Sequence, residues 1–417
     1  MNPYLIFIIV VIVGSYLANL AVTVMNLKAM DPELPEEFHG IFDREKYARS
    51  QNYTRETSKL DLTAGAVSTI ITIIFILAGG FNLVDGIARS AGMGTIYTGL
   101  VFTGIIFLLS TMMELPFSIY STFVIEEKFG FNRTDIKTFL SDLFKTTLLT
   151  LILGGMVLAG VLWFFETGGP YAWLWCWGGV FSFMFLMQFL APVIIMPLFN
   201  KFTPLEEGEL RQAIEDYADR ENFRMQGIYT MDGSKRSTKL NAFFTGVGRF
   251  RRIVFYDTLI EKLDIPEIVA VLAHEMGHFR LKHVYKMLVA SALQTGIMFW
   301  MLSFFLDNEG LFQAFGMEHI SIYAGIVFFG FLFTPVSMFV MIIFNIFSRR
   351  HEYEADAYAA KSSGLAMELV SALRKLSAEN LSNLTPHPLY VFLNYSHPPV
   401  LERIRRLRAM ADGSNSA

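Results

Sequence analysis

The chain is poor in cysteine and in charged residues. Its single cysteine, Cys176, excludes a disulfide scaffold, because a lone thiol has no partner within the chain. Charged side chains make up 17% of the residues, whereas a soluble domain carries about a quarter. The net charge of -4 supplies no general basic surface, which excludes a nucleic acid partner. With so little polar surface, the chain is expected to have the lipid bilayer as its main solvent.

Apolar residues are correspondingly abundant. They amount to 53% of the chain, and phenylalanine alone occurs 40 times. A helix needs about 20 mostly apolar residues to cross a bilayer. Seven stretches without Lys or Arg meet this need: Tyr4 to Met25, Leu62 to Val84, Thr95 to Met113, Thr147 to Phe165, Tyr171 to Phe199, Met287 to Leu306 and Ile320 to Phe347. The sequence therefore predicts a mainly α, polytopic membrane protein with seven transmembrane helices.

Basic residues are divided very unevenly between the segments that connect these stretches. Alternate segments on one side hold 33 of the 34 Lys and Arg residues, and the other side holds only Arg89. Because Lys and Arg accumulate on the cytoplasmic side, we expect the N-terminus outside and the C-terminus in the cytoplasm. Two segments large enough to fold, 200–286 and 348–417, then both lie in the cytoplasm.

The first of these segments contains the pattern His-Glu-x-x-His. Asp264 supplies an N-cap directly before a helix that is expected to begin near Ile265. On that helix His274 and His278 lie one turn apart and project from one face, so that both can bind one Zn²⁺. Glu275 beside them is the candidate general base for a water molecule that attacks a peptide bond.

A second group of candidate ligands follows the last predicted span. A catalytic zinc needs a third protein ligand and one open position. Glu352 and Asp356 are spaced i, i+4 on an expected helix, so one can bind the metal while the other braces an imidazole. His351 and Glu354 are neighbours that also offer ligand atoms. Spacing alone leaves the choice between Glu352 and Glu354 open.

Two further elements lie outside these helices. His397 precedes two prolines on extended or turn backbone, where it is either an oxyanion donor or an ordinary surface histidine. The segments 241–246 and 251–256 have the pattern of a short hairpin that begins at Asn241. Its exposed edge either takes up an extended peptide as an added strand or is purely structural.

Together these residues resemble the integral-membrane zinc proteases of the Ste24-type CAAX prenyl protease family, peptidase family M48. The similarity extends from the first span to about Ala409. It includes the zinc motif, the run Glu126–Arg133, the run Glu352–Asp356 and the pair His397-Pro398. Many proteases share the zinc motif, whereas its combination with seven spans and the Glu126–Arg133 run is much more specific.

The resemblance implies a role for each metal-site residue. Glu352 would be the third zinc ligand beside His274 and His278, with one Zn²⁺ per chain. Asp356 would brace a zinc-bound histidine. A water activated by Zn²⁺, with Glu275 as general base, would then hydrolyse the peptide bond.

The resemblance also implies a substrate-binding arrangement. His397 would polarise the scissile carbonyl, Asn241 would lie on the edge strand that grips the substrate, and Arg403 would contact the substrate or an acidic partner. Seven helices would enclose a chamber in the membrane, capped by a cytoplasmic zincin-like catalytic domain with a small β-hairpin or sheet.

Four domains are expected on this basis. They are a membrane domain with spans one to five (1–199), a zinc-protease domain (200–286), spans six and seven (287–347), and a C-terminal segment that completes the active site (348–417).

The expected function is zinc-dependent endoproteolysis of peptides or proteins, with or without a prenyl group on a C-terminal Cys. The alternatives are a bacterial quality-control metalloprotease acting on unprenylated or misfolded membrane proteins, a non-catalytic lipidated-peptide binder, and a metal transporter. The C-terminal residues contain no endoplasmic-reticulum retrieval signal, which favours a bacterial inner membrane over the endoplasmic reticulum. The sequence carries no signal for a particular oligomeric state.

Overall fold

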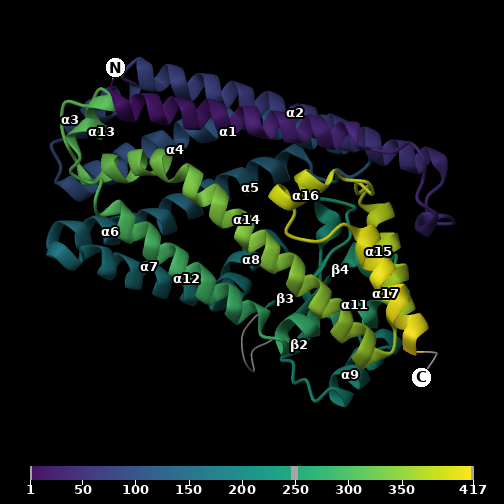
Figure 1. The fold of residues 1–417 in the computed structure, drawn as a ribbon. Coiled ribbons are helices and arrows are strands. Elements are labelled where there is room, and N and C mark those ends of the chain that lie inside the picture. Colours follow the sequence, from purple (N-terminus) through teal and green to yellow (C-terminus); the bar gives the residue numbers. More distant parts are fainter. Residues whose placement is uncertain (1, 246–251, 415–417) are drawn as a thin grey trace.

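The computed structural model describes residues 2–245 and 252–414 (Figure 1). The described chain is mainly helical, with α1 (Pro3–Lys28), α2 (Arg44–Leu77), α3 (Gly80–Ser90), α4 (Thr95–Tyr120), α5 (Ile136–Leu149), α6 (Gly155–Thr167), α7 (Ala172–Leu190), α8 (Met196–Phe199), α9 (Glu209–Arg220), α10 (Asp257–Ile260), α11 (Ile265–Arg280), α12 (His283–Leu302), α13 (Glu309–Ala314), α14 (Ile322–Ser363), α15 (Ala366–Glu379), α16 (Pro388–Asn394) and α17 (Val400–Ser414). Short π-helical segments continue some of these helices into longer rods: Ser121–Glu126, Thr150–Gly154 and Ala191–Ile195.

Six of the described helical rods are long and apolar enough to cross a bilayer: Pro3–Lys28, Arg44–Leu77, Thr95–Glu126, Ile136–Thr167, Gly169–Phe199 and Ile322–Ser363. The remaining expected span, Met287 to Leu306, corresponds mostly to α12, in which Lys286, Gln294 and Thr295 reduce the hydropathy. α12 packs against α7 and α14. The mainly α, multi-pass architecture is thus confirmed, whereas the count of seven spans is not.

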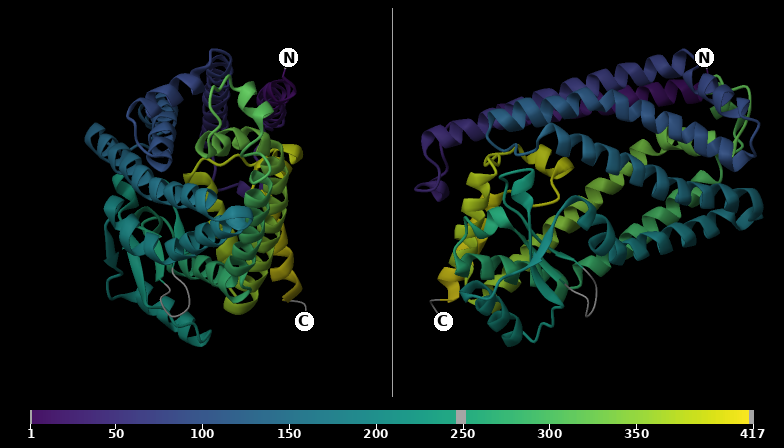
Figure 2. Two further views of the ribbon diagram at one scale, coloured as in Figure 1. Left: turned by 90° about the vertical axis from the view of Figure 1, so that its left-hand side faces the viewer. Right: turned by 180° about the vertical axis from the view of Figure 1, so that it is seen from behind.

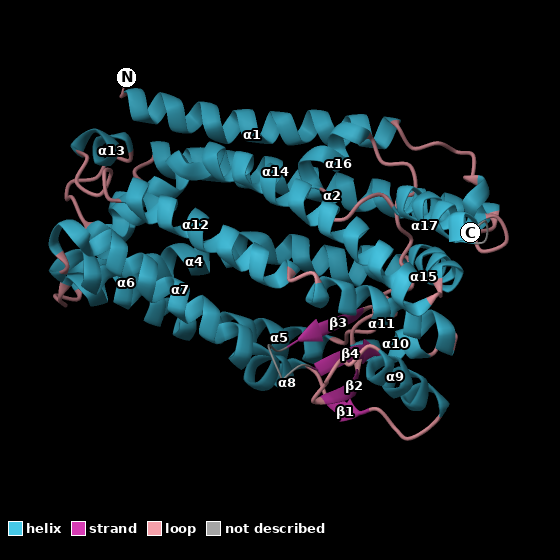
Figure 3. Ribbon diagram, turned by 60° about the horizontal axis from the view of Figure 1, so that its bottom comes forward, coloured by secondary structure: helices cyan, strands magenta, loops and turns pink. Residues whose placement is uncertain are grey.

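The long helices run between two differently built ends of the molecule (Figures 1 and 2). Near one end lie α3 and α13. Toward the other end lie the strands together with α9, α11, α15 and α17 (Figure 3). α14 belongs to both regions, because it contacts α4 and α13 as well as α11 and α17. This 42-residue helix carries the chain from the membrane directly into the candidate site.

A four-stranded sheet lies beside α11, in the order β1 (Phe202–Pro204), β2 (Gly227–Met231), β4 (Arg252–Tyr256), β3 (Ala242–Thr245). β3 pairs antiparallel with β4, which confirms the pairing expected for the two hairpin segments. The connecting residues 246–251 lie outside the described part of the chain. β2 and β4 are parallel, and β1 is antiparallel to β2. Within the described sheet, β3 is therefore an edge strand.

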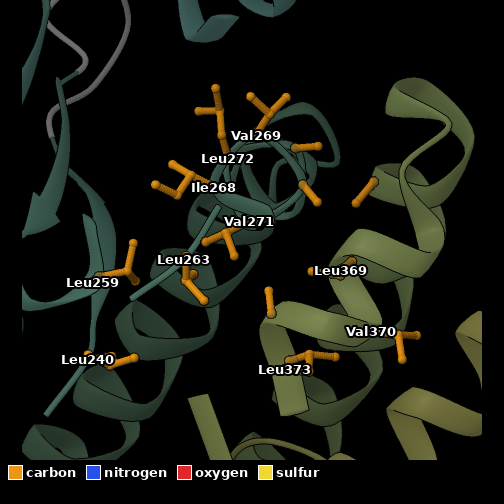
Figure 4. Packing of buried hydrophobic residues seen from close by; sticks show 14 of the residues in the cluster. Leu240, Leu259, Leu263, Ile268, Val269, Val271, Leu272, Leu369, Val370 and Leu373 are labelled. Carbon is orange, nitrogen blue, oxygen red and sulfur yellow. The ribbon is translucent and has the colours of Figure 1, made fainter. Parts of the chain in front are cut away.

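The core at the end that holds the strands is assembled from distant parts of the sequence. It joins residues of the segment before α2, of α9 to α11, and of α15 and α17. Figure 4 shows Ile268 and Leu272 of α11 in the same apolar cluster as Leu369 and Leu373 of α15. Each fully buried side chain of this kind contributes about 1.5–3 kcal/mol. Most of α11 is buried, so the helix is held firmly in one place and one rotation.

Candidate active site

α11 begins at Ile265, as the sequence predicts, and its first turn is tied to α15. The buried carboxylate of Glu267 accepts a hydrogen bond from the Asp264 backbone N–H at 2.8 Å. It also accepts hydrogen bonds from Ser371 Oγ at 2.6 Å and from Lys375 Nζ at 2.8 Å. These contacts fix the start of the helix that carries the His-Glu-x-x-His motif.

A glycine lets α11 approach α14 closely. A Cβ atom at Gly277 would lie 3.0 Å from Ala355 Cα and 3.1 Å from Ala355 O, shorter than ordinary van der Waals contacts. A side chain here would push the two helices apart by a few tenths of an ångström, so the glycine allows this close approach. The close approach brings Glu352 and Asp356, one turn apart on α14, against the histidines of α11.

His274, His278 and Glu352 converge on one point. The two Nε2 atoms are 3.2 Å apart, and Glu352 Oε1 and Oε2 lie 3.2 Å from His278 Nε2 and 3.5 Å from His274 Nε2. Tetrahedral ligands about 2.05 Å from a zinc ion are separated by about 3.3 Å. Two imidazoles and one carboxylate are also the ligand types of a catalytic zinc site. The residues present therefore fit this metal.

Asp356 and Arg403 surround this cluster. Asp356 Oδ1 lies 2.8 Å from His274 Nδ1, so the imidazole carries its proton on Nδ1 and directs a lone pair from Nε2 toward the cluster. Arg403 of α17 donates to both Asp356 oxygens at 2.7 and 2.8 Å, and its Nη1 lies 3.2 Å from Glu352 Oε2. The guanidinium is buried and braces both acids. Its contact with a substrate stays a prediction.

Burial and charge shape the titration of the groups on α11 and α17. Burial lowers the pKa of His274, but its contacts with Asp356 and Glu352 outweigh this and raise the pKa to about 9, so a zinc ion must displace a proton from Nε2 to bind there. Burial raises the pKa of Glu275 above its usual value, although the neighbouring histidines oppose the shift. For Arg403, burial lowers the pKa, while the same two acids raise it above its usual range. Once His274 is neutral, the carboxylates of Glu352 and Asp356 outnumber the one guanidinium of Arg403, which leaves a negative charge that suits a divalent cation.

The two candidate substrate contacts lie in different places. His397, in the loop between α16 and α17, has its Nε2 3.5 Å from Glu352 Oε1 and its side chain 65% exposed. Its Nδ1 is 2.9 Å from Ser396 Oγ. Asn241 directly precedes edge strand β3, is exposed, and accepts at its carbonyl oxygen from Tyr256 N–H at 3.0 Å. The structure thus brings His397 to the metal ligands and leaves Asn241 accessible beside the sheet edge.

The Glu126–Arg133 run lies against the segment that leads into β3. Thr238 N donates to Phe131 O at 3.1 Å, and Arg133 N donates to Arg236 O at 3.0 Å. Lys239 Nζ lies 3.0 Å from Glu126 Oε2 and 4.6 Å from the centre of the Phe131 ring. The end of the α4 rod is thereby fixed to the entry of the edge strand.

Sequence reasoning missed two residues of the site. It gave no role to Gly277 within the motif, because that role depends on the crossing of α14. It also did not name His283, the first residue of α12, whose Nδ1 lies 3.1 Å from His278 Nδ1. Lys282, between α11 and α12, adopts the left-handed conformation that turns the chain back toward the motif. No sequence spacing marks this turn.

Comparison with known proteins assigns the chain to a family. Residues 23–201 match the CAAX prenyl protease N-terminal domain with five membrane helices, and residues 204–411 match peptidase family M48. A CAAX prenyl protease 1 homolog of Oryza sativa subsp. japonica is 36% identical over 414 residues, which cover 97% of each chain. The chain belongs to family M48, in its CAAX prenyl protease branch. CAAX prenyl protease 1 of Saccharomyces cerevisiae is 36% identical over 410 residues, 91% of this chain and 89% of that protein.

A solved structure agrees with this family assignment. The crystal structure of S. mikatae Ste24p matches with a TM-score of 0.93 at 33% identity, covering 98% of this chain and 99% of that chain. The resemblance seen in the sequence is therefore confirmed, as is the prediction of an integral-membrane zinc metalloendopeptidase with a peptide or protein substrate. The alternatives of a binder and a transporter are not favoured.

Proposed function

We propose that this metalloendopeptidase cleaves peptides close to a prenylated C-terminal cysteine, with one Zn²⁺ per chain held by His274, His278 and Glu352. The main support is the convergence of these three side chains, each offering a ligand atom within 4.8 Å of the others. The prenylated substrate is supported by the names of the relatives, which are CAAX prenyl proteases. This chain matches them over nearly their whole length. Cleavage inside a membrane chamber stays a prediction.

The side chains around the metal have different roles in hydrolysis. When bound, zinc supplies a Lewis acid that polarises the scissile carbonyl and lowers the pKa of water from 15.7 toward about 7. Glu275 accepts a proton from the water whose oxygen attacks the carbonyl carbon. It returns this proton to the amine nitrogen as the C–N bond breaks. His397 Nε2–H donates to the carbonyl oxygen as negative charge develops there.

The edge of the sheet offers a way to hold the substrate. An extended peptide can pair with the free side of β3, whose other side is occupied by β4. β3 also contacts α11, so a peptide added to this edge runs beside the motif helix. Asn241, at the start of the strand, is then in place to contact the peptide backbone.

The proposed orientation follows from the basic residues. The cytoplasmic side carries 33 of the 34 Lys and Arg residues, with the catalytic end among them and the N-terminus outside. A prenylated protein made in the cytoplasm would reach the site from that side. The bacterial inner membrane as the location stays a prediction.

The experiment compares farnesylated and unfarnesylated versions of one peptide, incubated with the purified zinc-loaded protein and analysed by mass spectrometry. We expect cleavage of the farnesylated peptide, and a loss of about 10²-fold or more in Glu275→Gln with zinc retained. Equal cleavage of both peptides would contradict prenyl recognition and favour a quality-control protease. Cleavage by Glu275→Gln at nearly the wild-type rate would remove Glu275 from the role of general base.

A further inference from the structure

The second zinc-binding imidazole has a support of its own, separate from the aspartate that holds the first. His278 Nδ1 lies 3.1 Å from His283 Nδ1, and His283 Nε2 lies 3.0 Å from Glu354 Oε2. These three groups form a continuous chain from the metal ligand to a carboxylate. A zinc-bound histidine normally donates its other ring N–H to such an acceptor.

The positions of the protons follow from the geometry. His278 directs Nε2 toward His274 and Glu352, so its proton belongs on Nδ1. The Nδ1 of His283 must then accept, which places the proton of that ring on Nε2, opposite the Glu354 carboxylate. Each N–H in the chain then finds one acceptor.

The surroundings hold His283 and Glu354 in this arrangement. The His283 side chain is 3% exposed and stacks on His351, with ring centroids 4.0 Å apart and planes inclined by 12°. Glu354 Oε1 accepts from Arg350 Nε at 2.9 Å, and Lys286 Nζ lies 4.0 Å from its other oxygen. The two cations favour the ionised carboxylate that the chain requires.

We propose that His283 and Glu354 are positioning residues, which hold His278 in the tautomer and orientation that zinc binding needs. This role rests on the zinc ligands proposed above. It gives the two histidines of the motif equivalent supports. Asp356 contacts His274 directly, and Glu354 acts on His278 through His283.

The same groups also have the spacing of a metal site, because His283, His351 and Glu354 offer ligand atoms within 4.8 Å of one another. A metal on His283 Nε2 would force the proton of that ring onto Nδ1. That N–H would then face the N–H of His278 across 3.1 Å. While zinc occupies the first site, the hydrogen-bonded role of His283 is therefore the compatible one.

The test measures zinc affinity by competition with a chromogenic chelator, with no reference to activity. His283→Leu should bind zinc about 10- to 100-fold more weakly. His283→Gln should keep most of the affinity, because its carbonyl can accept from His278 and its amide can donate to Glu354. His351→Phe keeps a ring for stacking without ligand atoms and should bind zinc as the wild type does.

Visible spectra of the cobalt-substituted proteins provide a second readout. We expect altered ligand-field bands in His283→Leu and wild-type bands in His283→Gln. Wild-type affinity in His283→Leu would overturn the positioning role, and so would equal losses in His283→Leu and His351→Phe.

The variant His278→Ala distinguishes a failure of the positioning role from a failure of the zinc-ligand assignment. If His278→Ala loses zinc while His283→Leu keeps it, the positioning role alone fails. If His278→Ala keeps zinc at wild-type affinity, both the ligand assignment and the positioning role are wrong.

Discussion

Glu352 and Glu354 stand two positions apart on α14 and have different surroundings. Successive residues of an α-helix are rotated by about 100°, so these two side chains point about 200° apart. Glu352 therefore faces the histidines of α11, while Glu354 faces the start of α12. The sequence offers both as ligands, because one-dimensional spacing does not tell which face of α14 meets α11.

Replacing each acid separately tests this division. Glu352→Ala removes a ligand and should leave the purified protein almost without zinc. Glu354→Ala removes only the far end of the support to His278 and should keep most of the zinc at saturating supply. Elemental analysis of the two proteins decides, and equal losses would show that the ligand assignment is wrong.

The position of a single site residue is predictable where it follows from the repeat of one helix. The one-turn spacing of His274 and His278 predicts a shared ligand point on any helix. His283 was not predictable, because its contact depends on the left-handed turn at Lys282 and on the packing of α12. The buried position of Arg403 likewise depends on how α17 returns to the site.

Among the elements, α11 is the one that the sequence defines best. Its N-cap, its starting residue and its apolar positions all follow from local rules. These local rules do not predict that α15 supplies hydrogen-bond donors to the first turn of α11. Those partners come from more than 100 residues away, at Ser371 and Lys375.

This anchor should be measurable as stability. Glu267→Ala leaves the Asp264 N–H and the Ser371 hydroxyl without their acceptor, while Lys375 keeps its contact with Asp264, and should destabilise the protein by about 3 kcal/mol, seen as a lower melting temperature in detergent. Glu261→Ala, at an exposed position just before the helix, is the matched control and should change stability by less than about 0.5 kcal/mol. Similar melting temperatures for the two variants would contradict the anchoring role of Glu267.

The contact between the Glu126–Arg133 run and the segment that leads into β3 predicts an effect on substrate binding. Lys239→Met removes the ammonium group that contacts Glu126 and Tyr53. We expect KM to rise about fivefold, equivalent to about 1 kcal/mol, with kcat and zinc content unchanged. Lys235→Met, at an exposed position four residues earlier, should leave KM unaltered. A fall in kcat or in zinc content would show that the contact supports the metal site instead.

At the scale of the whole molecule, the membrane architecture is the most predictable feature. Lipid demands long apolar helices, and such runs are visible in any sequence. The catalytic core was less predictable, because segments before α2, around α11 and after α14 combine to build it. For α12, composition alone is a poor guide to whether the helix spans the bilayer. A helix packed against α7 and α14 has less need of an apolar surface on every side.

The orientation can be tested with single cysteines. Cys176 is buried, which gives the wild-type chain a low background. A membrane-impermeant maleimide added to intact cells should label Ala91→Cys, in an exposed turn between α3 and α4, but not Glu206→Cys, exposed on the catalytic side. Labelling of Glu206→Cys alone would reverse the proposed orientation.

The most direct measurement of the central claim is the molar ratio of zinc to protein, followed together with peptidase activity during chelation and zinc return. We expect a ratio near one in the active wild type. Ratio and activity should fall together in chelator and recover together with zinc, and His274→Ala should show neither. Full peptidase activity in protein stripped of zinc, or a ratio near one in His274→Ala, would contradict the account.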